Sequence, residues 1–269
     1  MQGEILRKEL AIISIDKARS EIIGKHKACK GKGVKEWIIQ DEKILLPRTV
    51  VSVCKCKKKF DTVSRLILSN IFYWKLINQQ IYHKVVFDEI SKKKIDLRKE
   101  ILYPYIKRIR EVVKNPYGLL LLGKHGTGKT FVGQKVLYYA ITRGYTAHYI
   151  EFSDFLRMLR KNFDEDLDGL INEILNVDLL MIDEIGNESR KSDFVIGEFK
   201  TLYKRRIQYN KPTILATNYS YSQFKKLYGK SIESMVSSYS RILDFEGVSN
   251  VRKAQSVTGM GSFFRELKK

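Results

Sequence analysis

The segment that follows the leucine run 119–122 reads Gly123, Lys124, His125, Gly126, Thr127, Gly128, Lys129 and Thr130. It matches the pattern G-x-x-x-x-G-K-[ST] at each fixed position. The leucines are typical of a buried strand, and Val132, Val136 and Ala140 share one face of the helix expected after the loop. The strand, loop and helix together predict a phosphate-binding loop.

The residue types in this segment suit a nucleotide and its metal ion. The three glycines let backbone N–H groups close around phosphate oxygens, and the N-terminus of the following helix adds the positive end of its dipole. Lys129 is expected to reach the β- and γ-phosphates of ATP, and the Thr130 hydroxyl is expected to hold Mg²⁺. We therefore predict that residues 123–130 bind the nucleotide, with His125 as a variable loop position.

Short apolar runs alternate with longer amphipathic stretches in the second half of the chain. The runs cover residues 117–122, 147–152, 177–182 and 212–217. Each run is mainly apolar rather than alternating, which indicates parallel strands covered by helices on both faces. We therefore expect an α/β fold over residues 101–269, with a helix from about Ser192 to Tyr209. Residues 1–60 are expected to form a small N-terminal domain of helical or zinc-binding-like character that binds a partner, and residues 61–100 a helical linker.

Two adjacent carboxylates and one amide follow the later apolar runs. Asp183 and Glu184 come directly after residues 177–182, and Asn218 follows residues 212–217. We expect Asp183, beside the phosphate loop, to hold the Mg²⁺ shell and Glu184 to activate the attacking water. A second carboxylate placed to activate water favours hydrolysis over phosphoryl transfer to a small molecule. Asn218 is expected either to contact the γ-phosphate or the lytic water, or to be a turn residue.

The chain is strongly basic. It has 50 Lys and Arg against 30 Asp and Glu, a net charge of +20, with a pI near 9.7. The phosphate loop requires only Lys129, so the surplus favours a nucleic acid partner, although solubility or a lysine-rich proteome would also explain it. The candidate DNA contacts are the basic clusters at residues 55–59, 92–94, 107–110 and 204–206.

No sequence feature indicates a membrane or a secreted protein. No apolar run approaches the roughly 18 residues that a membrane helix needs, and residues 1–10 lack the apolar stretch of a signal peptide. We therefore expect a cytoplasmic protein with no membrane partner.

Four side chains near the N-terminus have the spacing of a metal site. They are His26, Cys29, Cys54 and Cys56. Together they offer the four soft or borderline ligands of a tetrahedral Zn²⁺ site, and His83 is a substitute ligand. The alternative is a set of reduced cysteines with an unrelated histidine. If zinc is bound, the metal would fold a segment that has few core residues.

Three segments, taken in order, resemble the motifs of AAA+ ATPases. GKHGTGKT at 123–130 is similar to Walker A, LLMIDE at 179–184 to Walker B, and TILATN at 213–218 to sensor 1. Within that superfamily, residues 100–265 resemble the DnaC/DnaI-type replicative helicase loaders and the IstB-type transposition ATPases. The resemblance implies an AAA+ ATPase domain in which Arg252 is a sensor 2 arginine that follows the nucleotide state.

The resemblance leaves open which arginine acts on the ATP of a neighbouring subunit. Many relatives carry an arginine where this chain has Met235. Arg241 is the candidate for this catalytic role, with Arg205 and Arg206 as alternatives. An arginine from this part of the chain is equally expected as a surface or DNA-contacting residue.

The resemblance also implies a function. It suggests a replicative helicase loader that binds ATP and single-stranded DNA, forms a homo-oligomer on ATP binding and places a hexameric DNA helicase, gripped by the N-terminal module. One alternative is an IstB-type transposition ATPase, which acts with a transposase on duplex DNA and generally lacks the zinc module. Another is a nucleotide-switched adaptor or inhibitor of a helicase with weak hydrolysis, an option that Met235 keeps open.

Overall fold

The computed structural model describes residues 34–39, 48–54, 56–58, 61–62, 65, 85–160, 165–187 and 192–248. The chain divides into two compact units, residues 1–73 and 74–269. In the first unit, β1 (Val34–Ile39) and β2 (Arg48–Val53) pair in antiparallel fashion. Cys54 and Cys56 follow β2 and are buried.

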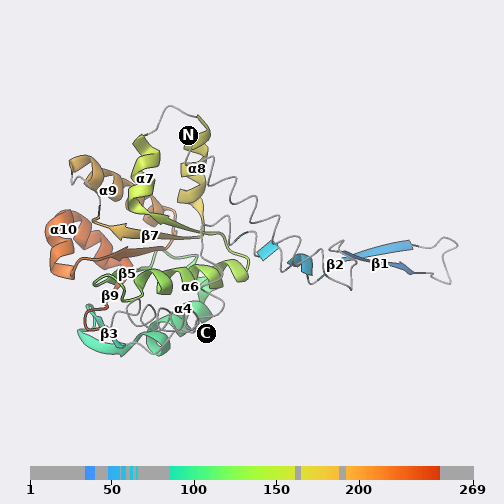
Figure 1. Cartoon of the computed structure of the whole chain (residues 1–269), viewed down its shortest axis with the longest axis horizontal. Coiled ribbons are helices and arrows are strands. Elements are labelled where there is room, and N and C mark those ends of the chain that lie inside the picture. The colour runs from blue at the N-terminus through green and yellow to red at the C-terminus, as the bar shows by residue number, and fades with distance from the viewer. Residues whose placement is uncertain are drawn as a thin grey trace, which may run out of the picture. The chain divides into compact units, whose positions relative to one another are not determined.

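The second unit is built on a seven-stranded sheet with the order β4-β3-β9-β5-β8-β7-β6 (Figure 1). Its strands are β3 (Val85–Asp88), β4 (Lys93–Asp96), β5 (Gly118–Leu122), β6 (Ala147–Glu151), β7 (Leu179–Ile185), β8 (Thr213–Thr217) and β9 (Ser240–Asp244). Neighbouring strands from β9 to β6 are parallel, while β3 and β4 join antiparallel beside β9. The mostly parallel sheet flanked by helices confirms the expected α/β fold class for this unit.

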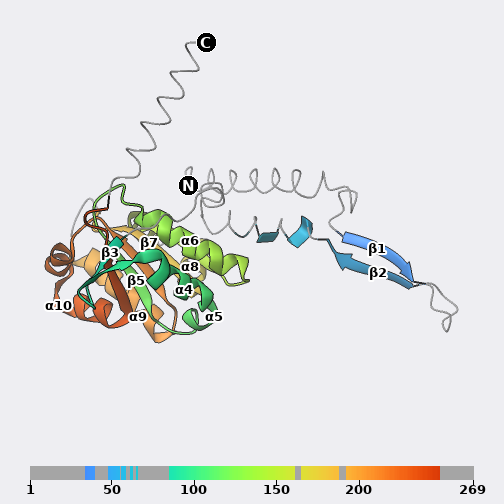
Figure 2. The same cartoon turned by 90° about the horizontal axis from the view of Figure 1, so that it is seen from below.

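Helices cover both faces of the sheet. They are η3 (Leu97–Leu102), a π-helix, followed by α4 (Tyr103–Lys107), α5 (Ile109–Val112), α6 (Lys129–Thr142), α7 (Phe152–Arg160), α8 (Glu165–Asn176), α9 (Asp193–Gln208) and α10 (Tyr221–Tyr239). Figures 1 and 2 show α6 and α9 on opposite faces. Leu120 and Leu122 pack in the core cluster formed with α7 to α10, whereas Leu119 and Leu121, also buried, alternate to the other face. The uninterrupted leucine run follows from this two-sided burial.

Local capping fixes the starts of the two long helices beside the sheet. The Ser192 side chain accepts a hydrogen bond from the Val195 backbone N–H at 3.4 Å, and α9 begins at the next residue. Ser220 and Gln223 form a reciprocal capping box at the start of α10. The helix expected from Ser192 to Tyr209 is confirmed.

The expectation of a helical linker over residues 61–100 is wrong for residues 85–96, whereas residues 97–100 lie in the π-helix η3. Residues 85–96 form the β3–β4 hairpin, and β3 extends the main sheet by pairing with β9. The Asp88 carboxylate holds the turn, because it accepts hydrogen bonds from the backbone N–H groups of Ile90 and Ser91. Each strand has four residues, too few for an alternating pattern to be distinguished from a helical one.

Candidate nucleotide-binding site

The phosphate loop connects the end of β5 to the start of α6, and its three glycines have conformations that other residues rarely adopt. The φ angle is 125° at Gly123, 80° at Gly126 and 91° at Gly128, which is the N-cap of α6. A Cβ added to Gly123 would lie only 3.1 Å from Phe245 Cβ. All three positions therefore favour glycine. At Gly123 a side chain would also crowd Phe245, which directly follows β9.

Lys129 is drawn into this loop rather than extended into solvent. Its side chain is 6% exposed, and Nζ donates hydrogen bonds to the carbonyl oxygens of Gly123 and, at 2.9 Å, Lys124. Nζ also donates to Asn218 Oδ1 at 3.0 Å, across 89 residues of sequence. The structure thus brings together the loop lysine and the amide at the end of β8, whereas the side chains of Lys124 and His125 are exposed.

Asp183, near the end of β7, lies within hydrogen-bond distance of three donors. Its Oδ2 accepts from the Thr130 hydroxyl at 2.6 Å and from the Tyr149 hydroxyl at 3.3 Å, and its Oδ1 accepts from the Glu184 N–H at 2.8 Å. Burial raises the pKa of Asp183 above its ordinary value, and the hydrogen bonds from Thr130 and Glu184 oppose this rise. The predicted metal-binding pair, Thr130 and Asp183, is therefore in direct contact.

Tyr149 is a site residue that motif reasoning missed. It lies on β6 opposite Met181 of β7 and is buried. Burial and the nearby Asp183 raise the pKa of the Tyr149 hydroxyl, so it remains a donor at neutral pH. The one signal in the sequence is a tyrosine within the apolar run 147–152, and only the strand order places it beside Asp183.

Glu184 has an unusual backbone conformation. Its φ is 55°, in the left-handed region, and the register of β7 against β8 shifts between Ile182 and Ile185. Such a bulge redirects side chains at a strand end, and left-handed non-glycine residues cluster at functional sites. The charge of the adjacent Glu184 adds to the effect of burial in raising the pKa of Asp183.

The donor set suits a magnesium-bound nucleoside triphosphate. A hydroxyl and a carboxylate oxygen, from Thr130 and Asp183, are the hard ligands that Mg²⁺ prefers. Lys129 supplies a positive charge at the mouth of a glycine loop that opens a helix of 14 residues. When bound, Mg²⁺ would neutralise charge on the phosphates.

The structure does not bring Arg241 to this site. Arg241 pairs with Leu119 near the start of β5, whereas the phosphate loop follows Leu122 at its end. The guanidinium donates to Asp88 of its own chain. Met235 packs against the core cluster.

Arg206 is a structural residue rather than a surface contact. It is 1% exposed, and its guanidinium donates to Thr213 Oγ1 and to the carbonyl oxygens of Leu175, Val177 and Pro212. The assignment of Arg206 to DNA contact or to a neighbouring subunit's ATP is wrong, because all of these partners lie within the same unit. Arg205 is half-buried and donates to Asn172 Oδ1.

Four other predicted residues lie outside the described part of the chain. They are His26, Cys29, His83 and Arg252. Among the described residues, no group of three or more His, Cys, Asp or Glu side chains is placed to hold a metal ion. No helix in the described part is both long enough and apolar enough to span a bilayer.

Comparison with known proteins identifies the family. The model of the IstB-like ATP binding protein family matches residues 106–244, just over half of the chain. The chain belongs to this family. The match begins in α4 and ends with β9, so the IstB-like region contains the phosphate loop, Asp183, Glu184 and Asn218.

Individual relatives match part of the length of this IstB-like protein. The replicative helicase loader DnaI of Bacillus subtilis (strain 168) is 31% identical over 125 residues, which cover 45% of this chain and 39% of DnaI. The replicative helicase loader DnaC of Escherichia coli (strain K12) is 29% identical over 129 residues, 46% of this chain and 51% of DnaC. The aligned regions thus span about half, or less, of each of these two relatives.

A crystal structure of the DnaC helicase loader is similar with a TM-score of 0.47 and 21% sequence identity, over 64% of this IstB-like chain and 97% of that chain.

Proposed function

We propose that this IstB-like protein is an ATPase that loads a replicative hexameric DNA helicase onto single-stranded DNA. The observation that carries the ATPase part is the convergence of Lys129, Thr130, Asp183 and Asn218 at one edge of the sheet, with Glu184 beside them. The names of the relatives DnaI and DnaC support the loader part. Homo-oligomer formation on ATP binding, with Arg252 following the nucleotide state, completes the proposal.

The proposed reaction is the hydrolysis of ATP to ADP and phosphate. Lys129 binds the β- and γ-phosphates, while Thr130 and Asp183 hold the Mg²⁺ shell. Glu184 takes a proton from water as the water oxygen bonds to the γ-phosphorus, and the bond between that phosphorus and the bridging oxygen breaks. Asn218 orients the γ-phosphate or the attacking water.

The test is the Glu184→Gln variant, assayed for ATP turnover with single-stranded DNA. Removal of a general base is expected to lower turnover about 100-fold or more, while ATP binding is retained. Glu173→Gln, an exposed change on α8, is the matched control and should keep wild-type turnover. Wild-type turnover by the Glu184→Gln variant would contradict the role of Glu184.

A second candidate function is a nucleotide-switched helicase adaptor or inhibitor with weak hydrolysis. Two observations favour it: Met235 is a packing residue, and Arg241 forms an ion pair with Asp88 of its own chain. A protein that binds ATP but shows no turnover with both DNA and a helicase present would support the adaptor and contradict the loader.

The family name favours a third candidate, an ATPase of transposition. Co-purification from the host, followed by identification of the bound protein, distinguishes a helicase partner from a transposase partner. A hexameric helicase in the complex supports the loader, and a transposase contradicts it.

A further inference from the structure

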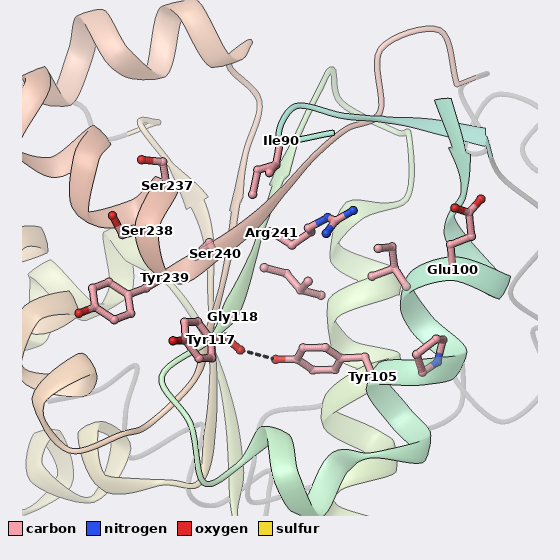
Figure 3. Close-up of a pocket in the computed structure, with 13 residues that line it drawn as sticks. Ile90, Glu100, Tyr105, Tyr117, Gly118, Ser237, Ser238, Tyr239, Ser240 and Arg241 are labelled. Atoms are coloured by element: carbon pink, nitrogen blue, oxygen red, sulfur yellow. Dashed lines mark hydrogen bonds between the residues drawn. The ribbon is translucent and has the colours of Figure 1, made fainter. Parts of the chain in front are cut away.

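A pocket of about 380 Å³ lies at the opposite end of β5 from the phosphate loop. Gly118 lines it, whereas Leu122, four residues along the strand, leads into the phosphate loop, a separation of roughly 13 Å at strand rise. Figure 3 shows the pocket between the end of α10 with β9 and the segment η3–α4. Side chains that line it include Ile90, Glu100, Tyr105, Tyr117, Tyr239 and Arg241. The volume is within the range of ligand-binding pockets.

Tyr117 stacks on the ring of Tyr239 and is otherwise largely exposed. Its ring lies 6.1 Å from that of Tyr239, centroid to centroid, at an interplanar angle of 23°. Tyr117 nevertheless remains 60% exposed, so the stack is open to a further planar group. The Tyr105 hydroxyl donates to the Tyr117 carbonyl oxygen at 3.3 Å and thereby holds the backbone that carries the ring (Figure 3).

The chain that leads to Tyr117 is basic and exposed. Residues 89–114 contain nine Lys or Arg against four Asp or Glu, a net charge of +5. In the last part of this segment, four cations are exposed: Lys107, Arg108, Arg110 and Lys114. An open aromatic stack with cations along the adjoining backbone is the combination by which proteins bind single-stranded nucleic acids.

We propose that one base of a single-stranded nucleic acid stacks on Tyr117 in this pocket and that its flanking phosphates contact the exposed cations of residues 107–114. A duplex does not suit the site, because its bases are stacked on one another and expose no face to a tyrosine. The inference rests on the proposed function in that both involve single-stranded DNA, and it places the strand away from the nucleotide site.

The test compares Tyr117→Ala with Tyr209→Ala in the full chain. Tyr209, on a different element, is 61% exposed, which makes it a matched control. Affinity for a labelled single strand of about 16 nucleotides, measured by fluorescence anisotropy, should fall about 5- to 100-fold for Tyr117→Ala. It should stay within about twofold for Tyr209→Ala and be preserved in Tyr117→Trp, which keeps a stacking face. Circular dichroism melts check that each variant folds.

A second pair of variants tests whether the cations of residues 107–114 contribute to binding of the single strand. Lys114→Ala should lower the slope of log affinity against log salt by about 0.7, the value for one phosphate contact to a single strand. Lys226→Ala, an exposed lysine on α10, should leave that slope unchanged. An equal slope for wild type and Lys114→Ala would overturn the assignment of phosphates to this segment.

The outcomes separate the inference from the proposed function. Wild type that binds the single strand, with Tyr117→Ala binding equally well, overturns the inference and leaves the proposed function standing. Wild type with no affinity for single strands overturns the inference and also removes DNA contact from the proposed function, whose ATPase part is tested separately with Glu184→Gln. Equal affinity for duplex and single strand, or a Tyr117→Ala defect confined to helicase capture, overturns the stacking site.

Discussion

At the scale of single residues, the ordering of Asp183 depends on a side chain that no motif contains. Thr130 and the Glu184 backbone are part of the recognised motifs, whereas Tyr149 reaches Asp183 from the neighbouring strand β6. Groups that orient a metal ligand affect metal affinity even though they do not touch the metal. We therefore expect Tyr149 to act as a positioning residue for the proposed magnesium site.

The Tyr149→Phe variant isolates this hydrogen bond. Loss of one bond to a buried carboxylate should raise the Mg²⁺ concentration that gives half-maximal ATP turnover by about 2- to 10-fold. ATP binding without Mg²⁺ should not change, because the hydroxyl contacts Asp183 and not the phosphate loop. Tyr145→Phe, a half-buried tyrosine before β6, is the control. A Mg²⁺ dependence equal to that of wild type would rule out the positioning role.

At the scale of elements, the β3–β4 hairpin is fastened to the sheet by one carboxylate. Asp88 is fully buried, accepts hydrogen bonds from the turn that follows it, and receives the Arg241 guanidinium from β9. Burial alone would raise the pKa of Asp88, but the hydrogen bonds from Ser91, Arg241 and Ile90 together lower it below its ordinary value of 3.8. The charged form is therefore the one that the fold stabilises.

Asp88→Asn should lower the free energy of unfolding by about 2 kcal/mol, because it removes a charge that several donors share. Urea denaturation followed by circular dichroism measures this, with the exposed change Glu111→Gln expected within about 0.5 kcal/mol of wild type. A similar decrease in the free energy of unfolding for Asp88→Asn and Glu111→Gln would contradict the stabilising role of Asp88.

The same carboxylate gives a pH dependence. Because the pKa of Asp88 is lower in the folded than in the unfolded chain, its stabilisation is complete above about pH 4. This stabilisation should be lost as the pH falls below about 4 and through the lower pKa of Asp88 in the folded chain, where the folded chain also binds the proton. In Asp88→Asn this part of the acid destabilisation should be absent.

The elements that could be predicted from sequence are those with a continuous local signal. The leucine run before Gly123, the apolar run before Asp183 and the capped helix α9 each show their pattern within one stretch of chain. The hairpin β3–β4 has strands too short for such a pattern. Tyr149 and the bulge at Glu184 depend on which strands are neighbours, and this information is distributed over the whole sheet.

At the scale of the whole molecule, the second unit has two candidate sites at opposite ends of the same strand. The phosphate loop follows the last residue of β5, and the Tyr117 pocket lies at its first residue. A central strand buried on both faces is a rigid connection between the two. The proposed ATP site and the inferred single-strand site would therefore share a scaffold without sharing a contacting residue.

The zinc proposal concerns the first unit. We propose that His26 and Cys29 join the buried Cys54 and Cys56 around one Zn²⁺. Protein purified without added metal should then contain about one zinc per chain by elemental analysis, and Cys54→Ser should lower this content strongly. Folded, active protein without zinc would contradict the site.

The contacts of Lys129 have a further consequence for ligand affinity. An ammonium group has three donors, and in the structure Nζ uses them on two loop carbonyls and on Asn218. We expect a phosphate oxygen that accepts from Nζ to compete with these acceptors for the donors of the ammonium group. The affinity for nucleotide would then reflect the difference between the hydrogen bonds that Nζ gains with phosphate and those that it loses within the loop. If the phosphate displaces Asn218, the Asn218 side chain loses its hydrogen bond to Lys129 when nucleotide binds. Nucleotide binding at the phosphate loop would then change the hydrogen-bond partner of a residue at the end of β8.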